Sequence, residues 1–483
     1  MHQVSLLIGG RDLAASEGAT FDRANPATGE IASRSAAATL SDADQAVAAA
    51  QAAFPEWSSL APNERRRRLL KAADLMEQRT NDFISAGTSE TGGTAGWYGF
   101  NVMLAAGMLR EAASMTTQIT GEIISSDLPG NFAMAVRQPC GVVLGIAPWN
   151  APVILGTRAV AMPLACGNSV VLKASEKCPA VHRLIGSVLQ EAGLGDGVVN
   201  VVLNAPEDAA QIVERLIANP AVRRVNFTGS TAVGRIVAQL AARHLKPALL
   251  ELGGKAPFVV LDDADLDAAV GAAAFGAFFN QGQICMSTER IIVDASIADQ
   301  FVEKLARKAT SLATANDESS GSLLGSLVSS DAAERIQELI DDAIARGARI
   351  AAGGGAKGAL MPPSVVDYVT NKMKLYSEES FGPVVCVVRV DGVDEAVRIA
   401  NDSEYGLSAA VFGRDVARAL SVAKRIESGI CHINGPTVHD EAQMPFGGVK
   451  ASGYGRFGGK AAIAEFTDLR WITVQTTPRH YPI

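Results

Sequence analysis

The fold is decided by residues 222–234, VRRVNFTGSTAVG. An expected strand, 222–227, is followed by Gly229 in a turn and by Ser230, where a helix that continues through Gly234 can start. The backbone amide groups in the first turn of such a helix can face a pyrophosphate, because they have no partner within the helix. This stretch therefore predicts a strand–turn–helix unit that binds a dinucleotide.

Similar units lie on both sides of this stretch. Apolar strands are expected at 142–146, 169–172, 198–203 and 258–261, and helices at 180–192, 207–218 and 265–279. An earlier helix is expected to begin with Ser41 as its N-cap. Strands that alternate with helices indicate parallel sheets with helices on both faces. We predict an α/β fold with two doubly wound, Rossmann-like domains, formed by residues 1–120 with 138–250 and by residues 251–450.

Two segments fall outside this alternation. Residues 121–137 contain two short extended runs around the turn LPGN at 128–131, and residues 470–475 form another strand-like run. A small hairpin is only marginally stable alone, and an exposed strand edge invites pairing. We therefore expect residues 121–137 and 466–483 to form a small β arm.

The composition indicates a globular chain. The 483 residues are 48% hydrophobic and 19% charged, which suits a soluble protein with a large core. The net charge of −8 argues against a nucleic-acid partner. Residues 1–11 lack the features of a secretory signal, and the apolar run 268–279 is too short to cross a bilayer, so no membrane contact is expected.

Six cysteines are scattered along the chain: Cys140, Cys166, Cys178, Cys285, Cys386 and Cys431. They show no CxxC pair and no histidine-rich spacing, which argues against a zinc site and against a disulfide framework. We therefore expect no bound metal and a reducing, cytoplasmic compartment.

Cys285 stands in a polar, glycine-containing turn, NQGQICMSTE at 280–289, which favours access over packing. The thiolate is the nucleophilic form of cysteine, and an ordinary thiol has a pKa of about 8.5. Taken alone, a cysteine is more often a core residue. Two other runs favour chemistry: LLELGGK at 249–255 carries the carboxylate of Glu251, and IAPWN at 146–150 ends in the amide of Asn150.

Together these stretches resemble the aldehyde dehydrogenase superfamily, and the resemblance extends from NPATGE at 25–30 to FGG at 446–448. It implies that Cys285 attacks the carbonyl carbon of an aldehyde to form a thiohemiacetal. It also implies that the Asn150 amide and the Cys285 backbone N–H hold the oxyanion, and that Glu251 activates the water that releases the acid from a thioester. In this family the hairpin and the last strand form an oligomerisation arm, so we expect a homodimer or a tetramer.

The resemblance also implies a nicotinamide cofactor. The usual GxGxxG pattern occurs at 353–358 and 453–458, but neither run follows an apolar strand and opens a helix. Glu176, just beyond the strand 169–172, can accept hydrogen bonds from ribose hydroxyls and repel a 2′-phosphate, which favours NAD over NADP. The expected cofactor residues are Ile146, Pro148, Trp149, Lys173, Ser175, Glu176, Gly229, Ser230, Val233, Gly234, Leu252, Glu379 and Phe381.

The chain departs from the family pattern in three places. Ala159 stands where many members carry a lysine, and Arg158 beside it occupies a position that is often aromatic. Phe457 stands where many members carry a glutamate. These departures argue against a proton relay built on those groups, whereas the nucleophile, the base and the oxyanion donor are in place.

Residues 431–450 resemble the bacterial branch of the family that oxidises aromatic aldehydes such as salicylaldehyde, vanillin and benzaldehyde. Salicylaldehyde, as in naphthalene breakdown, is the first expected substrate. Flat apolar and aromatic walls suit an aryl ring, although any single aromatic residue could equally be part of the core. The expected pocket residues are Trp97, Tyr98, Ile154, Arg158, Phe279, Ile284, Met286 and His439.

Four alternative functions are compatible with parts of the sequence. The same mechanism could oxidise aliphatic aldehydes or semialdehydes. Glu251 argues against a dehydrogenase that passes the acyl group to coenzyme A, because a hydrolytic base would be unwanted there. The presence of both Cys285 and Glu251 argues against a non-catalytic structural protein, and the cofactor stretches argue against a simple thioester or ester hydrolase.

Overall fold

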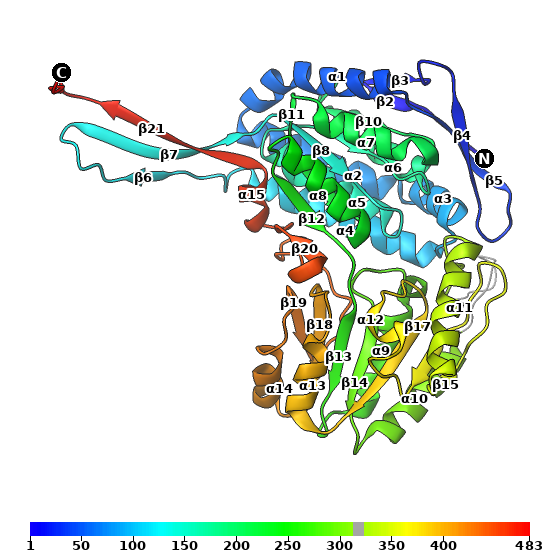
Figure 1. Ribbon diagram of the computed structural model, residues 1–483. Coiled ribbons are helices and arrows are strands. Elements are labelled where there is room, and N and C mark those ends of the chain that lie inside the picture. Colours follow the sequence, from blue (N-terminus) through cyan, green and yellow to red (C-terminus); the bar gives the residue numbers. More distant parts are fainter. Residues whose placement is uncertain (313–322) are drawn as a thin grey trace.

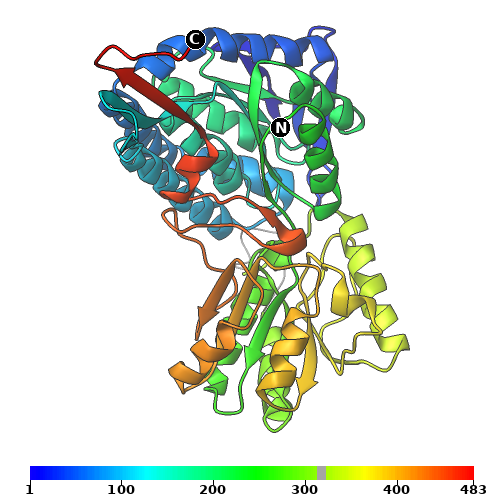
Figure 2. The ribbon, with the colours of Figure 1, turned by 60° about the vertical axis from the view of Figure 1, so that its left-hand side comes forward.

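The computed structural model describes residues 1–312 and 323–483. Figure 1 shows an upper lobe, a lower lobe and a β arm that projects from the upper lobe. The N-terminal half of the chain forms most of the upper lobe, and the chain then crosses to the lower lobe. Figure 2 shows the C-terminal segment, orange to red, returning from the lower lobe to the upper one.

The upper lobe is built on an eight-stranded sheet with the strand order β20-β12-β11-β8-β9-β10-β2-β3. Its strands are β2 (Leu6–Ile8), β3 (Arg11–Leu13), β8 (Val142–Ile146), β9 (Ser169–Lys173), β10 (Val199–Val202), β11 (Val222–Thr228), β12 (Ala248–Glu251) and β20 (Gly453–Tyr454). The five central strands run parallel, whereas β20, β2 and β3 pair antiparallel at the two edges. β8 and β9 are buried along their whole length, as expected for strands covered on both faces.

The helices of this lobe are α1 (Leu40–Ser59), α2 (Pro62–Gln78), α3 (Thr80–Thr91), α4 (Ala95–Met115), α5 (Pro152–Ala165), α6 (Pro179–Glu191), α7 (Ala209–Ala218) and α8 (Thr231–Arg243). The expected N-cap Ser41 is wrong, because Thr39 caps α1. The Thr39 hydroxyl accepts a hydrogen bond from the Asp42 N–H, and the Asp42 carboxylate accepts one from the Thr39 N–H. A second sheet, ordered β1 (His2–Val4), β5 (Ile31–Ala36) and β4 (Thr20–Ala24), was not expected.

The lower lobe is built on a seven-stranded sheet with the strand order β15-β16-β17-β14-β13-β18-β19. Its strands are β13 (Ala256–Val260), β14 (Thr288–Asp294), β15 (Arg349–Ala352), β16 (Ser364–Asp367), β17 (Val384–Val390), β18 (Ser408–Phe412) and β19 (Ile430–Ile433), and all but β15 run parallel. Its helices are α9 (Leu266–Phe278), α10 (Ala298–Ser311), α11 (Ser330–Ala345), α12 (Lys374–Ser377), α13 (Gly392–Asn401) and α14 (Val416–Ala423). Helices cover both faces of this sheet, and each face has its own apolar core.

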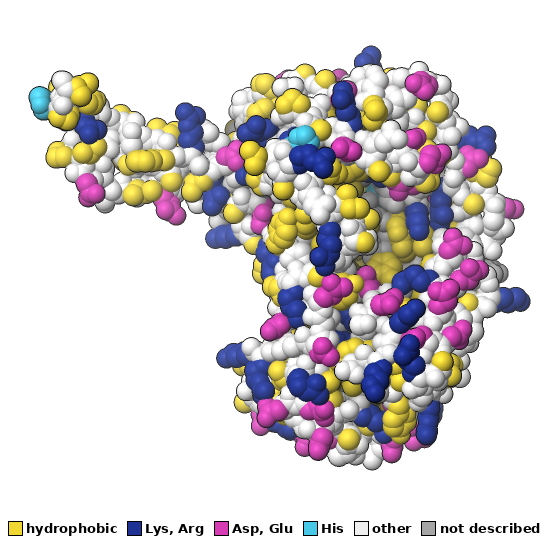
Figure 3. All heavy atoms as spheres, viewed as in Figure 1, with side chains coloured by type: hydrophobic (Ala, Val, Ile, Leu, Met, Phe, Trp, Pro, Cys, Tyr) yellow, Lys and Arg dark blue, Asp and Glu magenta, His cyan; other side chains and the backbone are white. Residues whose placement is uncertain are grey.

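The arm is a three-stranded antiparallel sheet. Its hairpin consists of β6 (Glu122–Ile124) and β7 (Asn131–Pro139). The third strand, β21 (Thr467–Gln475), pairs with β7 along its whole length. β21 begins three residues before the expected strand, directly after α15 (Ala461–Glu465). Figure 3 shows apolar side chains gathered along the arm. The expected pairing of the hairpin with the last strand is therefore present.

Two further expectations concern the whole chain. The GxGxxG run at 353–358 lies in the loop after β15, and the run at 453–458 begins with β20, so neither opens a helix. Within residues 1–312 and 323–483, no helix has the length and apolar character that a membrane crossing requires.

Candidate active site

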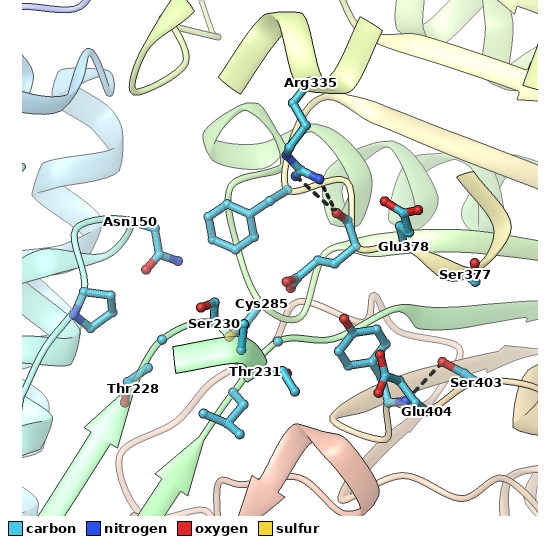
Figure 4. A pocket seen from close by; sticks show the side chains of 18 of the residues that line it. Asn150, Thr228, Ser230, Thr231, Cys285, Arg335, Ser377, Glu378, Ser403 and Glu404 are labelled. Carbon is cyan, nitrogen blue, oxygen red and sulfur yellow. Dashed lines mark hydrogen bonds between the residues drawn. The ribbon is translucent and has the colours of Figure 1, made fainter. Parts of the chain in front are cut away.

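A deep cleft lies between the two lobes, at the carboxyl ends of the central strands of the upper sheet. Its volume is about 1100 Å³. The upper lobe contributes residues 228–232, at the end of β11 and the start of α8, and the lower lobe contributes residues 376–379 and 401–405. Cys285 lines the cleft together with Ser230 and Asn150, and Figure 4 shows the three residues around it. Ligands of open α/β sheets bind at such a crevice beyond the carboxyl ends of the strands.

The turn before Cys285 is backbone-strained. The 3₁₀ segment η2 (Phe279–Gly282) follows α9, and within it Asn280 and Gln281 have φ values of 49° and 55°. Residues other than glycine rarely adopt this left-handed backbone conformation. It costs roughly 1–3 kcal/mol per residue, and residues that adopt it cluster at functional sites. Gly282 is required next, because a Cβ there would lie 2.1 Å from the Gly382 carbonyl oxygen. The turn thereby redirects the chain so that Cys285 reaches the cleft.

Cys285 lines the cleft and contacts the fully buried Glu251. The Cys285 thiol donates to Glu251 Oε2 at 3.7 Å, and among the described residues Glu251 Oε1 has no hydrogen-bond partner. Burial raises the pKa of Glu251 to about 8, although nearby Arg158 opposes this rise. Burial, followed by the Glu251 charge, also raises the pKa of the Cys285 thiol well above its ordinary value. Two neighbouring groups thus both resist becoming charged.

Asn150 is held in place by three hydrogen bonds. Its Nδ2 donates to the Gln283 carbonyl oxygen at 2.9 Å. The backbone carbonyl oxygen of Asn150 accepts from Trp97 Nε1 at 3.1 Å and from Asn280 Nδ2 at 3.0 Å. An amide nitrogen carries two N–H groups, so one remains for an oxyanion formed beside Cys285.

The expected cofactor residues fall into two groups. Those that line the cleft are Pro148, Trp149, Gly229, Ser230, Leu252, Glu379 and Phe381. Those outside its lining, at the ends of β8 and β9 and within α8, are Ile146, Lys173, Ser175, Glu176, Val233 and Gly234. The Trp149 and Phe381 rings meet edge to face across the cleft, with their centroids 5.6 Å apart.

The cleft fits a dinucleotide. Ser230 caps α8 through the Val233 N–H at 3.4 Å, so the amide end of that helix opens into the cleft. At Gly253 a Cβ would lie 2.6 Å from Glu379 Oε2, so the backbone and this carboxylate lie close together here. Glu379 Oε1 accepts from the Gly254 N–H at 2.9 Å, which orients the carboxylate.

The loop after β9 lies next to this cleft. Lys173 and Glu176 form an ion pair, and Glu176 also accepts from Asn204 Nδ2 at 3.2 Å. The Lys177 ammonium lies 5.2 Å from the centre of the Trp149 ring. Because Trp149 lines the cleft, the loop carrying Glu176 lies beside the part of the cleft formed by the upper lobe.

Aromatic rings gather around Phe279, six residues before Cys285 in the chain. Phe279 contacts Trp97 and Phe275, with ring centroids 5.0 Å and 4.8 Å apart, and Phe100 packs on both Trp97 and Phe279. Of the other expected pocket residues, the buried apolar ones are Ile154 on α5 and Ile284 and Met286, the immediate neighbours of Cys285. These rings and aliphatic chains form an apolar surface near the nucleophile.

Two expected pocket residues lie elsewhere. The structure does not support Tyr98 as a pocket residue, because it is fully buried, its hydroxyl is bonded to Thr91 at 2.6 Å, and its ring fills the space beside Gly87. His439 is half-exposed and is bonded to Glu441 at 2.8 Å.

Arg158 has a partner that the sequence did not indicate. Its guanidinium forms a buried ion pair with Asp440 and lies 4.2 Å from the centre of the Phe446 ring. Phe457 lies on the same guanidinium at 5.9 Å, and Ala159 packs against Gly145 of β8. The positions that depart from the family pattern are thus filled by a fixed ion pair and apolar contacts.

Further residues at this site were missed. Asn280 and Gln283 hold Asn150, and Asp440 holds Arg158. The signal for Asp440 was its place in the acidic pair Asp440-Glu441 beside His439, but its partner is 282 positions away. Within the described part of the chain, no group of histidine, cysteine and acidic side chains could hold a metal ion.

Comparison with known proteins agrees with this geometry. The profile of the aldehyde dehydrogenase family matches residues 13–472. A vanillin dehydrogenase of Pseudomonas sp. is 70% identical over 483 residues, covering 100% of both chains, and a salicylaldehyde dehydrogenase of Pseudomonas putida is 51% identical over 481 residues, covering 99% of this chain and 100% of the other. The crystal structure of a salicylaldehyde dehydrogenase from Pseudomonas putida G7, complexed with salicylaldehyde, superposes with a TM-score of 0.98 at 50% identity and covers 100% of both chains. The expected α/β architecture is thereby confirmed.

Proposed function

Because the chain belongs to the aldehyde dehydrogenase family, whose members oxidise aldehydes to acids with a nicotinamide dinucleotide, we propose that it oxidises an aromatic aldehyde with NAD. The observation that carries the proposal is the approach of the Cys285 thiol to Glu251 at 3.7 Å inside a cleft that fits a dinucleotide. A nucleophile next to a base is the arrangement that covalent catalysis requires.

The first step forms a bond between the Cys285 sulfur and the carbonyl carbon. Because burial keeps the thiol protonated, Glu251 accepts its proton as the sulfur attacks. The carbonyl oxygen becomes an oxyanion, and the free N–H of Asn150 and the Cys285 backbone N–H donate to it. One such donor lowers the activation barrier by about 3 kcal/mol.

The bound nicotinamide ring supplies the acceptor for the hydride that leaves the thiohemiacetal carbon. Cys285 then carries a thioester. Glu251, once it has released the thiol proton, accepts a proton from water, whose oxygen attacks the thioester and restores the thiol. The net change converts aldehyde, NAD and water into acid, NADH and a proton.

The aromatic substrate class is supported by the rings that surround Phe279 and by the similarity to vanillin and salicylaldehyde dehydrogenases. Vanillin is the stronger candidate by identity, at 70% against 51%, and salicylaldehyde and a place in naphthalene breakdown stay predictions.

The assembly and the compartment belong to the same proposal. The residue ranges 1–120 with 138–250, 251–450, and 121–137 with 466–483 would act as cofactor domain, catalytic domain and oligomerisation arm. The exposed Trp471 and Ile123 of the arm support a homodimer or a tetramer. All six thiols are unpaired, which supports a reducing cytoplasm.

Steady-state rates with a panel of aldehydes test the proposal. Vanillin, salicylaldehyde and benzaldehyde should give kcat/KM values well above those of acetaldehyde and succinate semialdehyde, with NAD preferred over NADP. Cys285→Ala should abolish turnover while NAD still binds, and Cys140→Ala, which removes a half-buried thiol far from the cleft, should keep it. Equal rates for aliphatic and aromatic aldehydes would contradict the substrate class, and turnover by Cys285→Ala would contradict the mechanism.

A further inference from the structure

One buried histidine on α6 has no part in the chemistry above. His182 is fully buried, and its Nδ1 accepts a hydrogen bond from the Ser175 N–H at 3.0 Å. The backbone of Pro152 also faces the ring; its only polar group is the carbonyl, which can only accept, so Nε2 is the nitrogen that carries the proton. The two partners therefore fix a single neutral tautomer.

This tautomer persists at working pH. Burial, followed by the charge of Lys173, lowers the pKa of His182 to about 3. Its other polar neighbour is the Cys178 thiol, 3.9 Å from Nδ1 and 3.8 Å from Nε2, and burial raises the pKa of that thiol well above its ordinary value. His182 is therefore neutral, and Nδ1 remains available as an acceptor.

The two partners of His182 belong to two different parts of the cleft. Ser175 lies in the loop after β9, which carries Glu176 and places Lys177 over the ring of Trp149. Pro152 begins α5, two residues after Asn150. The imidazole ring thus connects the loop beside the expected ribose site to the segment that carries the oxyanion donor.

Helices α5 and α6 pack closely around the His182 ring. A Cβ at Gly156 of α5 would lie 2.6 Å from Ile185 Cδ1 and 3.0 Å from His182 Cδ2. Glycine therefore lets α5 and α6 approach closely enough for the ring to reach the Pro152 carbonyl. Glu90 holds the start of α6 by accepting from the Ala180 N–H at 2.9 Å and the Val181 N–H at 3.3 Å.

We propose that His182 is a positioning residue that holds the 174–178 loop, and with it Glu176, in the place where the adenosine ribose of NAD binds. The proposal rests on the proposed use of NAD. The observation behind it is the bond from the Ser175 N–H to Nδ1, which ties the middle of the loop to α6, whereas the backbone bond from the His182 N–H to the Cys178 carbonyl ties only the end of the loop. Loss of the Ser175 bond loosens the loop next to Glu176 without touching Cys285 or Glu251.

Two substitutions separate the two bonds of the ring. In His182→Asn the amide oxygen stands near the place of Nδ1 and can accept from Ser175, whereas in His182→Gln the longer amide stands near Nε2 and can donate to Pro152 only. Ile185→Val on the same helix is the control, because it loosens the packing against Gly156 and removes no hydrogen bond.

Calorimetric titration of the free enzymes with NAD gives the direct readout. We expect His182→Gln to weaken NAD binding about tenfold, the loss typical of one buried hydrogen bond, and to raise the KM for NAD rather than lower kcat. His182→Asn should stay within about twofold of wild type, and Ile185→Val should lose thermal stability but not affinity.

The outcomes are distinct. Equal affinities for the glutamine and asparagine variants, or losses that follow thermal stability across all three variants, would overturn the positioning role. A wild-type enzyme that binds neither NAD nor NADP would instead overturn the proposed function, and this proposal with it.

Discussion

The ammonium nitrogen of Lys255 lies 2.6 Å from Oε2 of Glu289, and both side chains are buried. The same carboxylate accepts from the Ser380 hydroxyl at 2.6 Å, from the Ser380 N–H at 3.0 Å and from the Phe381 N–H at 3.1 Å. One buried ion pair thus fixes the loop that presents Glu379 and Phe381 to the cleft.

Glu289→Gln should destabilise the protein, because it leaves the Lys255 ammonium buried without a counter-charge. Such a loss typically costs about 3–5 kcal/mol, and the double variant Glu289→Gln/Lys255→Met should recover most of it. Urea denaturation midpoints measure both effects. Glu303→Gln, which breaks the exposed pair with Arg307, is the matched control, and an equally small change in both single variants would contradict the prediction.

The pH dependence of kcat/KM should report Glu251. Burial raises the pKa of Glu251 to about 8, and the carboxylate is the form that accepts a proton, so the active form is present above that pKa. We expect kcat/KM to rise as the pH increases from 6.5 and to level off above 8. Rates across buffered pH values check this, with NAD binding measured over the same range as the control. A flat profile between pH 6.5 and 9 would show that Glu251 is ionised throughout.

Glu251→Gln should separate the two halves of the reaction. Hydride transfer can still occur, but more slowly, because the thiol must lose its proton to solvent in place of Glu251. No carboxylate then activates the water for thioester hydrolysis. We expect a burst of NADH equal to the number of active sites, followed by steady turnover reduced about 10²- to 10⁴-fold. Stopped-flow absorbance at the NADH band measures the burst. Steady turnover at the wild-type rate would show that another group serves as the base.

Glu176→Gln should relax the preference for NAD. The substitution removes a charge that repels a 2′-phosphate, and it frees Lys173 to pair with that phosphate. We expect kcat/KM for NADP to rise about tenfold, which corresponds to a free-energy change of about 1.4 kcal/mol. Glu207→Gln, at an exposed position, should leave the ratio unchanged. Equal use of NAD and NADP by the wild-type enzyme would remove the basis of this expectation.

The arm should hold two copies together. Ile123, Leu469 and Trp471 are 77%, 62% and 76% exposed, an unusual apolar surface for a free arm. We expect a dimer at least, and Trp471→Glu should shift it toward the monomer because a charge would enter the contact. Light scattering behind a sizing column measures the mass. Ile350→Glu, on the remote edge strand β15, should keep the wild-type mass, and a monomeric active wild type would refute the prediction.

The central strands could be predicted because their sequences carry the signal themselves. β8 and β9 are short, mostly apolar runs that end at polar turns, and buried parallel strands have this pattern. The cap of α1 was misplaced by two residues, because Thr39 and Ser41 can both cap a helix and only the reciprocal bond with Asp42 distinguishes them.

Long-range pairs could not be predicted in the same way. Arg158 and Asp440 are 282 positions apart, and Lys255 and Glu289 are 34 apart, so no local pattern links either pair. His182 looked like an ordinary residue of a helix expected at 180–192, and its role depends on where α5 passes. Each of these contacts is created by packing between elements, which the sequence specifies only through the complete fold.

Because the chain returns to the upper lobe at its C-terminal end, that lobe can be completed only late in synthesis. β20 covers the edge of β12, the strand that ends at Glu251, and β21 supplies the neighbour of β7. The growing chain therefore carries an open sheet edge and an unpaired hairpin while the whole lower lobe is being made, and such edges are prone to wrong pairing. The lobe that is begun first is completed last, so the base that the reaction needs is fixed in place only when nearly the entire chain has left the ribosome.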